Sequence, residues 1–301
     1  MKNILEFYYN LSLEEEILNR NGNYYFVINN NSFVFRPFYG NNNSIDDIYK
    51  LNNYLSNFSY IDKIILNKFN SPITKVKDNL YVLILLKGNN NINLSIISNL
   101  ASIDIPSFKS LERNNWEVLW GNLIDYYEMQ IGQNEKKYPL IRESFDYFVG
   151  MGENAISYLV NTKKEVKPNF YDKKVLSHNN LYNSLFDPLN IILDHKARDL
   201  AEYIKLSFFN NNQNIFKELD EYFYYNHYSL YGMRILFARI MYPSFYFKLY
   251  DEILSKKKEE KELNSIIKRI DEYELYLSNI YFYLRKYYDI PMIEWLKKTR
   301  T

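Results

Sequence analysis

The residues best suited to chemistry lie in one short stretch, VLSHNNLYNSLFDPLNIILDHKARDLAEYIK, at 175–205. It holds two of the chain's three histidines, His178 and His195, together with Asp194 and Asp199. Imidazole and carboxylate groups close together are the side chains that acid–base catalysis uses. The stretch is therefore the first candidate for a functional site.

Composition narrows the chemistry open to this chain. Its 301 residues include 37 Lys and Arg against 36 Asp and Glu, which gives a net charge of +1. Such a balance creates no bulk field to attract nucleic acid or an anionic membrane, so neither partner is expected. The chain has no cysteine, which excludes disulfides, cysteine-bound zinc and a thiol nucleophile. With three histidines in all, a histidine metal site is not expected either.

The N-terminal segment is expected to be neither a signal peptide nor a membrane span. In MKNILEFYYNLSLEEEILNR, Glu6 and Asn10 interrupt a short apolar run and acidic residues follow, unlike a signal peptide. No other segment reaches the roughly 18 uninterrupted apolar residues of a membrane-spanning helix. We therefore expect synthesis and folding in the cytoplasm, without membrane insertion.

The first hundred residues favour an antiparallel sheet with one inserted helix. Apolar residues at helical spacing predict that helix at 44–58. Ser12 and Glu15 have the spacing of a capping box, which predicts a further short helix ending at Asn21 and Gly22. Aromatic and β-branched runs predict the strands: NYYFVI (23–28), SFVFRPF (32–38), ITKVK (73–77) and DNLYVLILLKG (78–88).

After residues 103–107 the apolar spacing becomes helical and stays so. The predicted helices are 116–131, 141–162, 197–209, 230–242 and 263–288, with a hairpin-like stretch at 175–194. A small sheet lobe followed by a larger helical lobe is an α+β, bilobal plan. We place the mainly β lobe at 1–90 and the helical lobe at 91–301.

The order of these parts resembles the aminoglycoside-phosphotransferase and choline-kinase branch of the protein-kinase-like fold. Three blocks narrow the resemblance to the YutH branch of the spore-coat, kinase-like CotS group: YFVGMGENAISYL (147–159), LDHKARDLAEYIK (193–205) and RILFARIMYPSFYF (234–247). They occur in the family's order and span most of the helical lobe, whereas the sheet lobe matches only in layout. The resemblance implies a small antiparallel-sheet N-lobe and a helical C-lobe.

The resemblance also implies what stands at the catalytic positions. Asn180 occupies the place of the aspartate that accepts the acceptor's proton, and a carboxamide cannot do so. His178 is expected to hydrogen-bond the catalytic-loop backbone. Leu185 falls where the family has an asparagine that helps to hold a second magnesium, while Asn183 and Asn190 lack that spacing.

Two charged residues are implied as nucleotide contacts. Asp194 matches the family's metal-binding aspartate; it either binds Mg-nucleotide weakly or caps a strand end. Arg36 stands where relatives have a phosphate-contacting lysine, and a guanidinium is not equivalent to a compact ammonium. The other interpretation of Arg36 is a solvent-facing strand arginine. If nucleotide binds, the implied cofactors are ATP and magnesium, weakly held.

Three other features favour structural roles. Asp199 and Glu202 have capping-box spacing, so Asp199 is expected to start the following helix. His195 and Arg198 are expected to fasten the loop. Gly150-x-Gly152 lies inside a helical pattern, which predicts helix packing rather than a phosphate loop.

The sequence and the resemblance lead to two hypotheses about function. The first is a catalytically impaired kinase-like protein, a pseudokinase, acting as a structural or assembly component of a spore coat, with other coat or assembly proteins as partners. Its location is then the cytoplasm, or the spore coat if the organism sporulates. The alternative is a small-molecule phosphotransferase that uses ATP and magnesium, with Asp187 or Asp194 as a substitute base and a small-molecule acceptor.

Overall fold

The structure is a computed structural model, and it describes residues 1–13, 16–40, 42–58, 61–88, 92–134, 137–181 and 185–297. Its contacts divide the chain into two compact units. The first comprises Met1–Ile92, Asp104–Glu112 and Leu176–Leu193, and the second comprises Asn93–Ile103, Arg113–Val175 and Asp194–Thr301. The predicted lobe of 1–90 falls within the first unit, which also takes in two later segments; the boundary at residue 90 stays a prediction.

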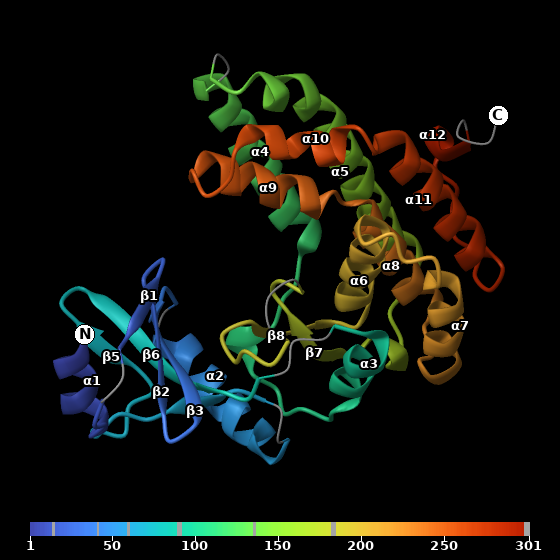
Figure 1. The fold of residues 1–301 in the computed structure, drawn as a ribbon. Coiled ribbons are helices and arrows are strands. Elements are labelled where there is room, and N and C mark those ends of the chain that lie inside the picture. Colours follow the sequence, from blue (N-terminus) through green and yellow to red (C-terminus); the bar gives the residue numbers. More distant parts are fainter. Residues whose placement is uncertain are drawn as a thin grey trace. The chain divides into compact units, whose positions relative to one another are not determined.

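An antiparallel sheet forms the centre of the first unit (Figure 1). Its strands are β1 (Leu18–Arg20), β2 (Asn23–Ile28), β3 (Asn31–Phe38), β4 (Lys63–Ile65), β5 (Thr74–Val76) and β6 (Asn79–Leu86). Their order is β1-β2-β3-β6-β4, and β5 also pairs with β6. The four strands predicted from aromatic and β-branched runs are confirmed. The predicted helix at 44–58 is α2 (Asn42–Tyr54), extended by the short turn η1 (Leu55–Asn57).

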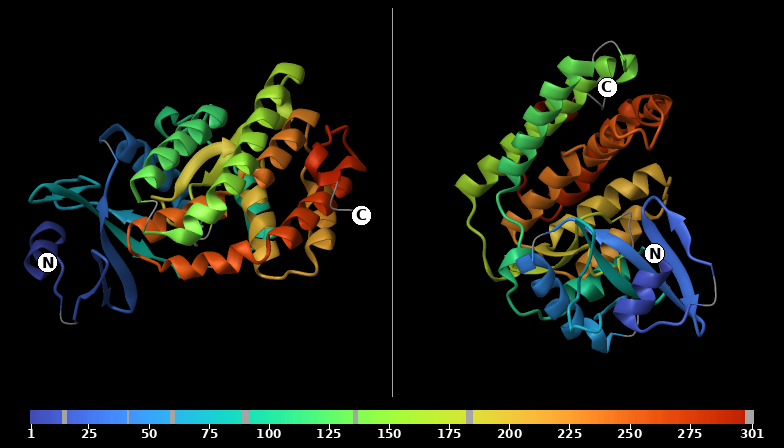
Figure 2. Two further views of the ribbon diagram at one scale, coloured as in Figure 1. Left: turned by 90° about the horizontal axis from the view of Figure 1, so that it is seen from above. Right: turned by 90° about the vertical axis from the view of Figure 1, so that its left-hand side faces the viewer.

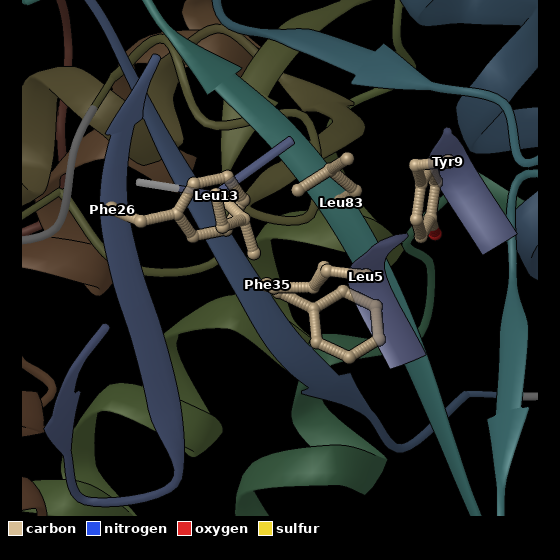
Figure 3. Packing of buried hydrophobic residues seen from close by; sticks show 6 residues of the cluster. All are labelled: Leu5, Tyr9, Leu13, Phe26, Phe35 and Leu83. Atoms are coloured by element: carbon tan, nitrogen blue, oxygen red, sulfur yellow. The ribbon is translucent and has the colours of Figure 1, made fainter. Parts of the chain in front are cut away.

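One face of this sheet packs against α1 (Lys2–Tyr9). Leu5 and Tyr9 of the helix meet Phe35 of β3 and Leu83 of β6 in a buried cluster (Figure 3). Phe35 is fully buried, and its ring centroid lies 6.0 Å from that of Tyr9. Because this cluster joins the helix to the two central strands, it holds in place the strand that carries Arg36.

The helix predicted from Ser12 to Gly22 is wrong. Leu18–Arg20 is instead strand β1, and Leu18 pairs with Tyr25 of β2. Asn21 and Gly22 form the hairpin turn, with φ angles of 53° and 82°. Positive φ at both central residues is what a type I′ turn requires, and Asn-Gly is its preferred sequence. Glu15, the other half of the predicted capping box, lies outside the described residues.

The second unit is helical, as predicted. Its helices are α3 (Leu94–Ser102), α4 (Trp116–Asn134), α5 (Pro139–Glu165), α6 (Ala197–Phe209), α7 (Ile215–Tyr225), α8 (Leu230–Met241), α9 (Ser244–Leu254), α10 (Asn264–Ile267), α11 (Ile270–Arg285) and α12 (Glu294–Lys297). The long helix α5 packs against α4 and α8, and α8 packs against α6 (Figure 2). The helix predicted at 263–288 is divided into α10 and α11.

Two short strands, β7 (Lys174–His178) and β8 (Ile191–His195), pair with each other within the predicted hairpin-like stretch. The fold is therefore α+β, with an antiparallel sheet first and a mainly helical part after it. None of the helices that the structure describes is both long and apolar enough to cross a membrane.

Candidate functional site

The loop between β7 and β8 is held by its own polar side chains. His178 Nε2 lies 2.8 Å from the carbonyl oxygen of Leu185, and because a carbonyl only accepts, Nε2 carries the proton. The Asn190 side chain holds both backbone groups of Asn180. Its Oδ1 accepts from the Asn180 N–H at 3.0 Å, and its Nδ2 donates to the Asn180 carbonyl at 2.9 Å.

The position that the resemblance assigns to a second magnesium ligand holds an apolar side chain. Leu185 is fully buried, so it forms part of the core under the loop. Asn190, the nearby carboxamide, is already committed to the backbone of Asn180, and Asn183 lies outside the described residues. Of these residues, Leu185 has no oxygen in its side chain, and Asn190 uses its carboxamide to hold the Asn180 backbone.

Arg36 of β3 forms an ion pair inside the first unit. Its Nη2 lies 2.7 Å from both carboxylate oxygens of Asp187, and Asp187 Oδ1 also accepts from the Leu189 N–H at 3.0 Å. The Asp187 side chain is only 11% exposed, so this pair is largely shielded from water. Burial raises the pKa of the neighbouring Asp62, and the negative charge of Asp187 raises it further. In this position the Arg36 guanidinium neutralises the carboxylate of Asp187.

Asp194, the penultimate residue of β8, is surrounded by donors from the second unit. Its Oδ2 accepts from Arg239 at 2.9 Å and from Arg198 at 3.2 Å. Its Oδ1 accepts from the Trp116 indole at 3.1 Å and from the His195 N–H at 2.7 Å. The residue is 2% exposed. Each carboxylate oxygen thus accepts two hydrogen bonds, which fills the usual capacity of an ionised carboxylate.

The two arginines are fixed from their other side by Trp116. The guanidinium carbons of Arg198 and Arg239 each lie 4.4 Å from its ring centroid, a cation–π geometry. Burial lowers the pKa of Arg239, whereas Asp194 opposes that shift. Burial also lowers the pKa of Arg113, and the charge of Arg198 lowers it further. These cations lie close together and need Asp194 as their counter-charge.

One face of α6 extends this ionic network. Arg198, Glu202 and Lys205 lie at i, i+4 and i+7, so they share that face. Lys205 Nζ lies 2.6 Å from both Glu202 Oε1 and Ser244 Oγ. The Lys205 charge, together with these bonds, outweighs the effect of burial and keeps the pKa of Glu202 below its usual value.

The capping box predicted at Asp199 is wrong. Helix α6 has Lys196 at its N-cap, without a side-chain cap, and Asp199 lies in its first turn. Glu202 does not reach back to the helix start because it bonds Lys205 and Ser244. A carboxylate in the first turn still suits the helix dipole, so Asp199 favours the helix without capping it.

His195 and Arg198 both fasten the loop, as expected. His195 Nδ1 accepts from the Ala197 N–H at 3.0 Å, and Nε2 lies 3.1 Å from Asp172 Oδ1. Ser229 also donates to that carboxylate at 2.6 Å. Burial lowers the pKa of His195 even though Asp172 opposes the shift. The imidazole is therefore held in its neutral form with Nε2 protonated.

Both glycines of the G-x-G sequence lie inside α5, as predicted. A Cβ atom on Gly152 would stand 3.0 Å from Ile124 Cδ1 of α4, whereas one on Gly150 would meet nothing within 4 Å. Gly152 thus permits the close approach of α4 and α5. Across the described residues, no group of three or more His, Asp or Glu side chains is placed to hold a metal ion.

Comparison with solved structures defines the fold class. An aminoglycoside phosphotransferase from Alicyclobacillus acidocaldarius matches with a TM-score of 0.63 and 10% identity, covering 95% of this chain and 96% of that one. A spectinomycin phosphotransferase bound to AMP matches with a TM-score of 0.58 and 17% identity, covering 87% and 93%. At these identities the likeness concerns the fold alone, which is that of the kinase-like phosphotransferases.

A family model described as "spore coat putative kinase YutH" matches residues 2–280, and the chain belongs to this family. The endospore coat-associated protein YutH of Bacillus subtilis is 30% identical over 209 residues. That match covers 61% of this chain and 61% of the relative. The chain thus spans about three fifths of the curated relative that it matches.

Sequence reasoning missed the partners of Asp194. Trp116 and Arg239 lie 78 and 45 residues away along the chain, and no local pattern links them to it. A partial signal was available, since Arg198 follows Asp194 at i+4 and begins the charged face of α6. That spacing predicts a short-range ion pair, but not the second arginine.

Replacing Asp194 tests whether it is the counter-charge of the buried arginines. We expect Asp194→Ala to lower the free energy of unfolding by about 3–5 kcal/mol, because two guanidinium groups lose their carboxylate. Asp194→Asn should cost less, since an amide oxygen still accepts. Urea denaturation followed by circular dichroism measures both. Glu143→Ala, at an exposed position of α5, is the control and should stay within about 0.5 kcal/mol.

The buried imidazole predicts a pH dependence. The folded-state pKa of His195 lies below its ordinary value of 6.5. Its contribution to the stability of the fold is therefore complete above pH 6.5 and declines as the pH falls through that value. Burial raises the pKa of Asp172, but its hydrogen bonds to His195 and Ser229 lower that pKa by more. The contribution of Asp172 to the free energy of unfolding is therefore lost only in more acidic solution. The melting temperature should thus fall more steeply between pH 7 and 5 for the wild type than for His195→Gln. Parallel curves would contradict this.

Proposed function

We propose that this chain is a catalytically impaired kinase-like protein, a pseudokinase, that serves as a structural or assembly component of a spore coat. The main support is the environment of Asp194. This carboxylate stands at the position that the resemblance assigns to the metal-binding aspartate, yet it accepts four hydrogen bonds, two of them from arginines. A carboxylate so occupied serves the packing of the second unit.

The residues present do not fit magnesium. Mg²⁺ requires close, nearly octahedral oxygen ligands, and a divalent cation at Asp194 would have to displace the guanidinium groups of Arg198 and Arg239. In the first unit, Arg36 binds Asp187, so the position of the phosphate-contacting lysine is also occupied by an internal ion pair. Asn180 supplies no carboxylate to accept a proton.

The alternative is a small-molecule phosphotransferase that uses ATP and magnesium. It is favoured by the fold, which the aminoglycoside and spectinomycin phosphotransferases share, and by the presence of a carboxylate at Asp194. For Asp187 or Asp194 to act as the base, its ion pair would have to open. Three side chains, Asn180, Leu185 and Arg36, would remain unlike those of active relatives.

Nucleotide binding distinguishes the two functions. A ligand at a hundred times its dissociation constant stabilises a protein by about 2.7 kcal/mol, so a thermal-shift titration with ATP and magnesium detects it. We expect no magnesium-dependent rise in melting temperature and no ATP turnover. Asn180→Asp should stay inactive, because Asp194 keeps its arginine partners. ATP turnover by the wild type that Asn180→Ala or Asp187→Asn abolishes would overturn the pseudokinase proposal.

Coat association is a separate expectation, supported by the name of the Bacillus subtilis relative. A fluorescent fusion of the full chain, produced in sporulating Bacillus subtilis cells that lack their own YutH, should concentrate at the spore surface. Asn180→Asp should localise in the same way, because the proposed role needs no catalysis. A wild-type signal that stays diffuse through sporulation would contradict the structural role, whatever the outcome with ATP.

A further inference from the structure

A groove lined mainly by residues with hydroxyl, carboxamide or carboxylate groups lies within the second unit. Its walls are formed by α3 and α7, two helices labelled in Figure 1. Its volume of about 780 Å³ is within the range of small-molecule sites. Each helix contributes one face, because the lining residues recur at i, i+3, i+4 and i+7. They are Ser95, Ser98, Asn99 and Ser102 from α3, and Glu218, Glu221, Tyr222 and Tyr225 from α7.

Hydrogen bonds hold the two walls in register. Asn226, which follows α7, donates from Nδ2 to Ser98 Oγ at 2.9 Å, and its Oδ1 lies 3.1 Å from the same oxygen. On the α7 side, Glu218 accepts from the Tyr203 hydroxyl at 2.8 Å and from Asn212 at 3.1 Å. The groove is thus built on fixed contacts, and the Glu218 carboxylate already has protein partners.

The lining chemistry restricts the ligand. No Lys or Arg is among the described residues that line the groove, so an anion finds no counter-charge. Hydroxyl and carboxamide groups of Ser95 and Asn99 are exposed on one wall. On the other wall Tyr225 is 78% exposed, which presents an aromatic face beside the carboxylate of Glu221. Glu218 is held by two neutral donors and keeps its negative charge, so the lining carries two carboxylates, Glu218 and Glu221, among many neutral groups. Both carboxylates accept hydrogen bonds, which suits a neutral ligand rich in hydroxyl groups, and a polycation is the competing class of ligand that the test includes.

We propose that this groove binds a saccharide. A pyranose ring has one apolar C–H face, which can stack on the ring of Tyr225, and equatorial hydroxyls that can donate to Glu221 and exchange hydrogen bonds with Ser95 and Asn99. Tyrosine is suited to such contacts because its ring is apolar and its hydroxyl is polar. The site does not depend on nucleotide binding or on the pseudokinase proposal, since neither Asp194 nor Arg36 lines it.

Titration of the full chain with three neutral trisaccharides, N,N′,N″-triacetylchitotriose, maltotriose and cellotriose, tests the proposal by saturation-transfer NMR and calorimetry. We expect at least one to bind, with saturation transfer strongest to the C–H protons of one ring. Tyr225→Ala should weaken that binding about tenfold through loss of the aromatic contact, and Glu221→Gln should weaken it less. Tyr287→Ala is the matched control, because Tyr287 is 65% exposed in the same unit and does not line the groove.

Three results would overturn the proposal. The first is that none of the three trisaccharides binds. The second is that Tyr225→Ala and Tyr287→Ala bind alike, which would place the sugar elsewhere. The third is that spermidine binds in a Tyr225-dependent way while the neutral sugars do not, which would make the groove a cation site. Both tyrosines are largely exposed, so both variants should keep the wild-type melting temperature.

Discussion

The buried ion pairs between Asp194 and the two arginines, Arg198 and Arg239, are the interaction on which the second unit depends. Removing three charges from water is costly unless they satisfy one another, and here one carboxylate oxygen, Oδ2, accepts from both arginines. The partners come from the end of β8, from α6, from α8 and, through Trp116, from α4. A single carboxylate thus links β8 and the adjacent helix α6 to α4 and α8, which lie far from it in the sequence.

This constraint decides what the same residue can do chemically. A carboxylate cannot both neutralise two guanidinium groups and serve as an open metal ligand, since its oxygens have a limited number of acceptor positions. Arg36 and Asp187 repeat the pattern in the first unit, where two groups that a phosphotransferase could use bind each other. Under the proposed function, internal pairs take the place of contacts to a ligand, and the fold needs no bound nucleotide to satisfy its buried charges.

The sequence predicted those parts of the structure that depend on residues close together in the chain. The alternating and aromatic runs of β2 and β3 and the apolar spacing of α5 predicted those elements, because each buries one face. The sequence Asn21-Gly22 was ambiguous, because such a pair can end a helix or form a hairpin turn. Here it forms the turn, because Leu18–Arg20 pairs with β2. The position of Asp194 was predicted, but not its partners, because Trp116 and Arg239 reach it only through tertiary packing.

The groove between α3 and α7 shows the same division between local and tertiary information. Each wall is a stripe at helical spacing and so is visible in the sequence, yet nothing local indicates that the two stripes face each other. Their pairing follows from the bond between Ser98 and Asn226, which are 128 residues apart. This polar surface takes no part in the ion pairs of Asp194. Under the two proposals, this chain lacks phosphoryl transfer and still binds a ligand, because the two regions are held by different side chains.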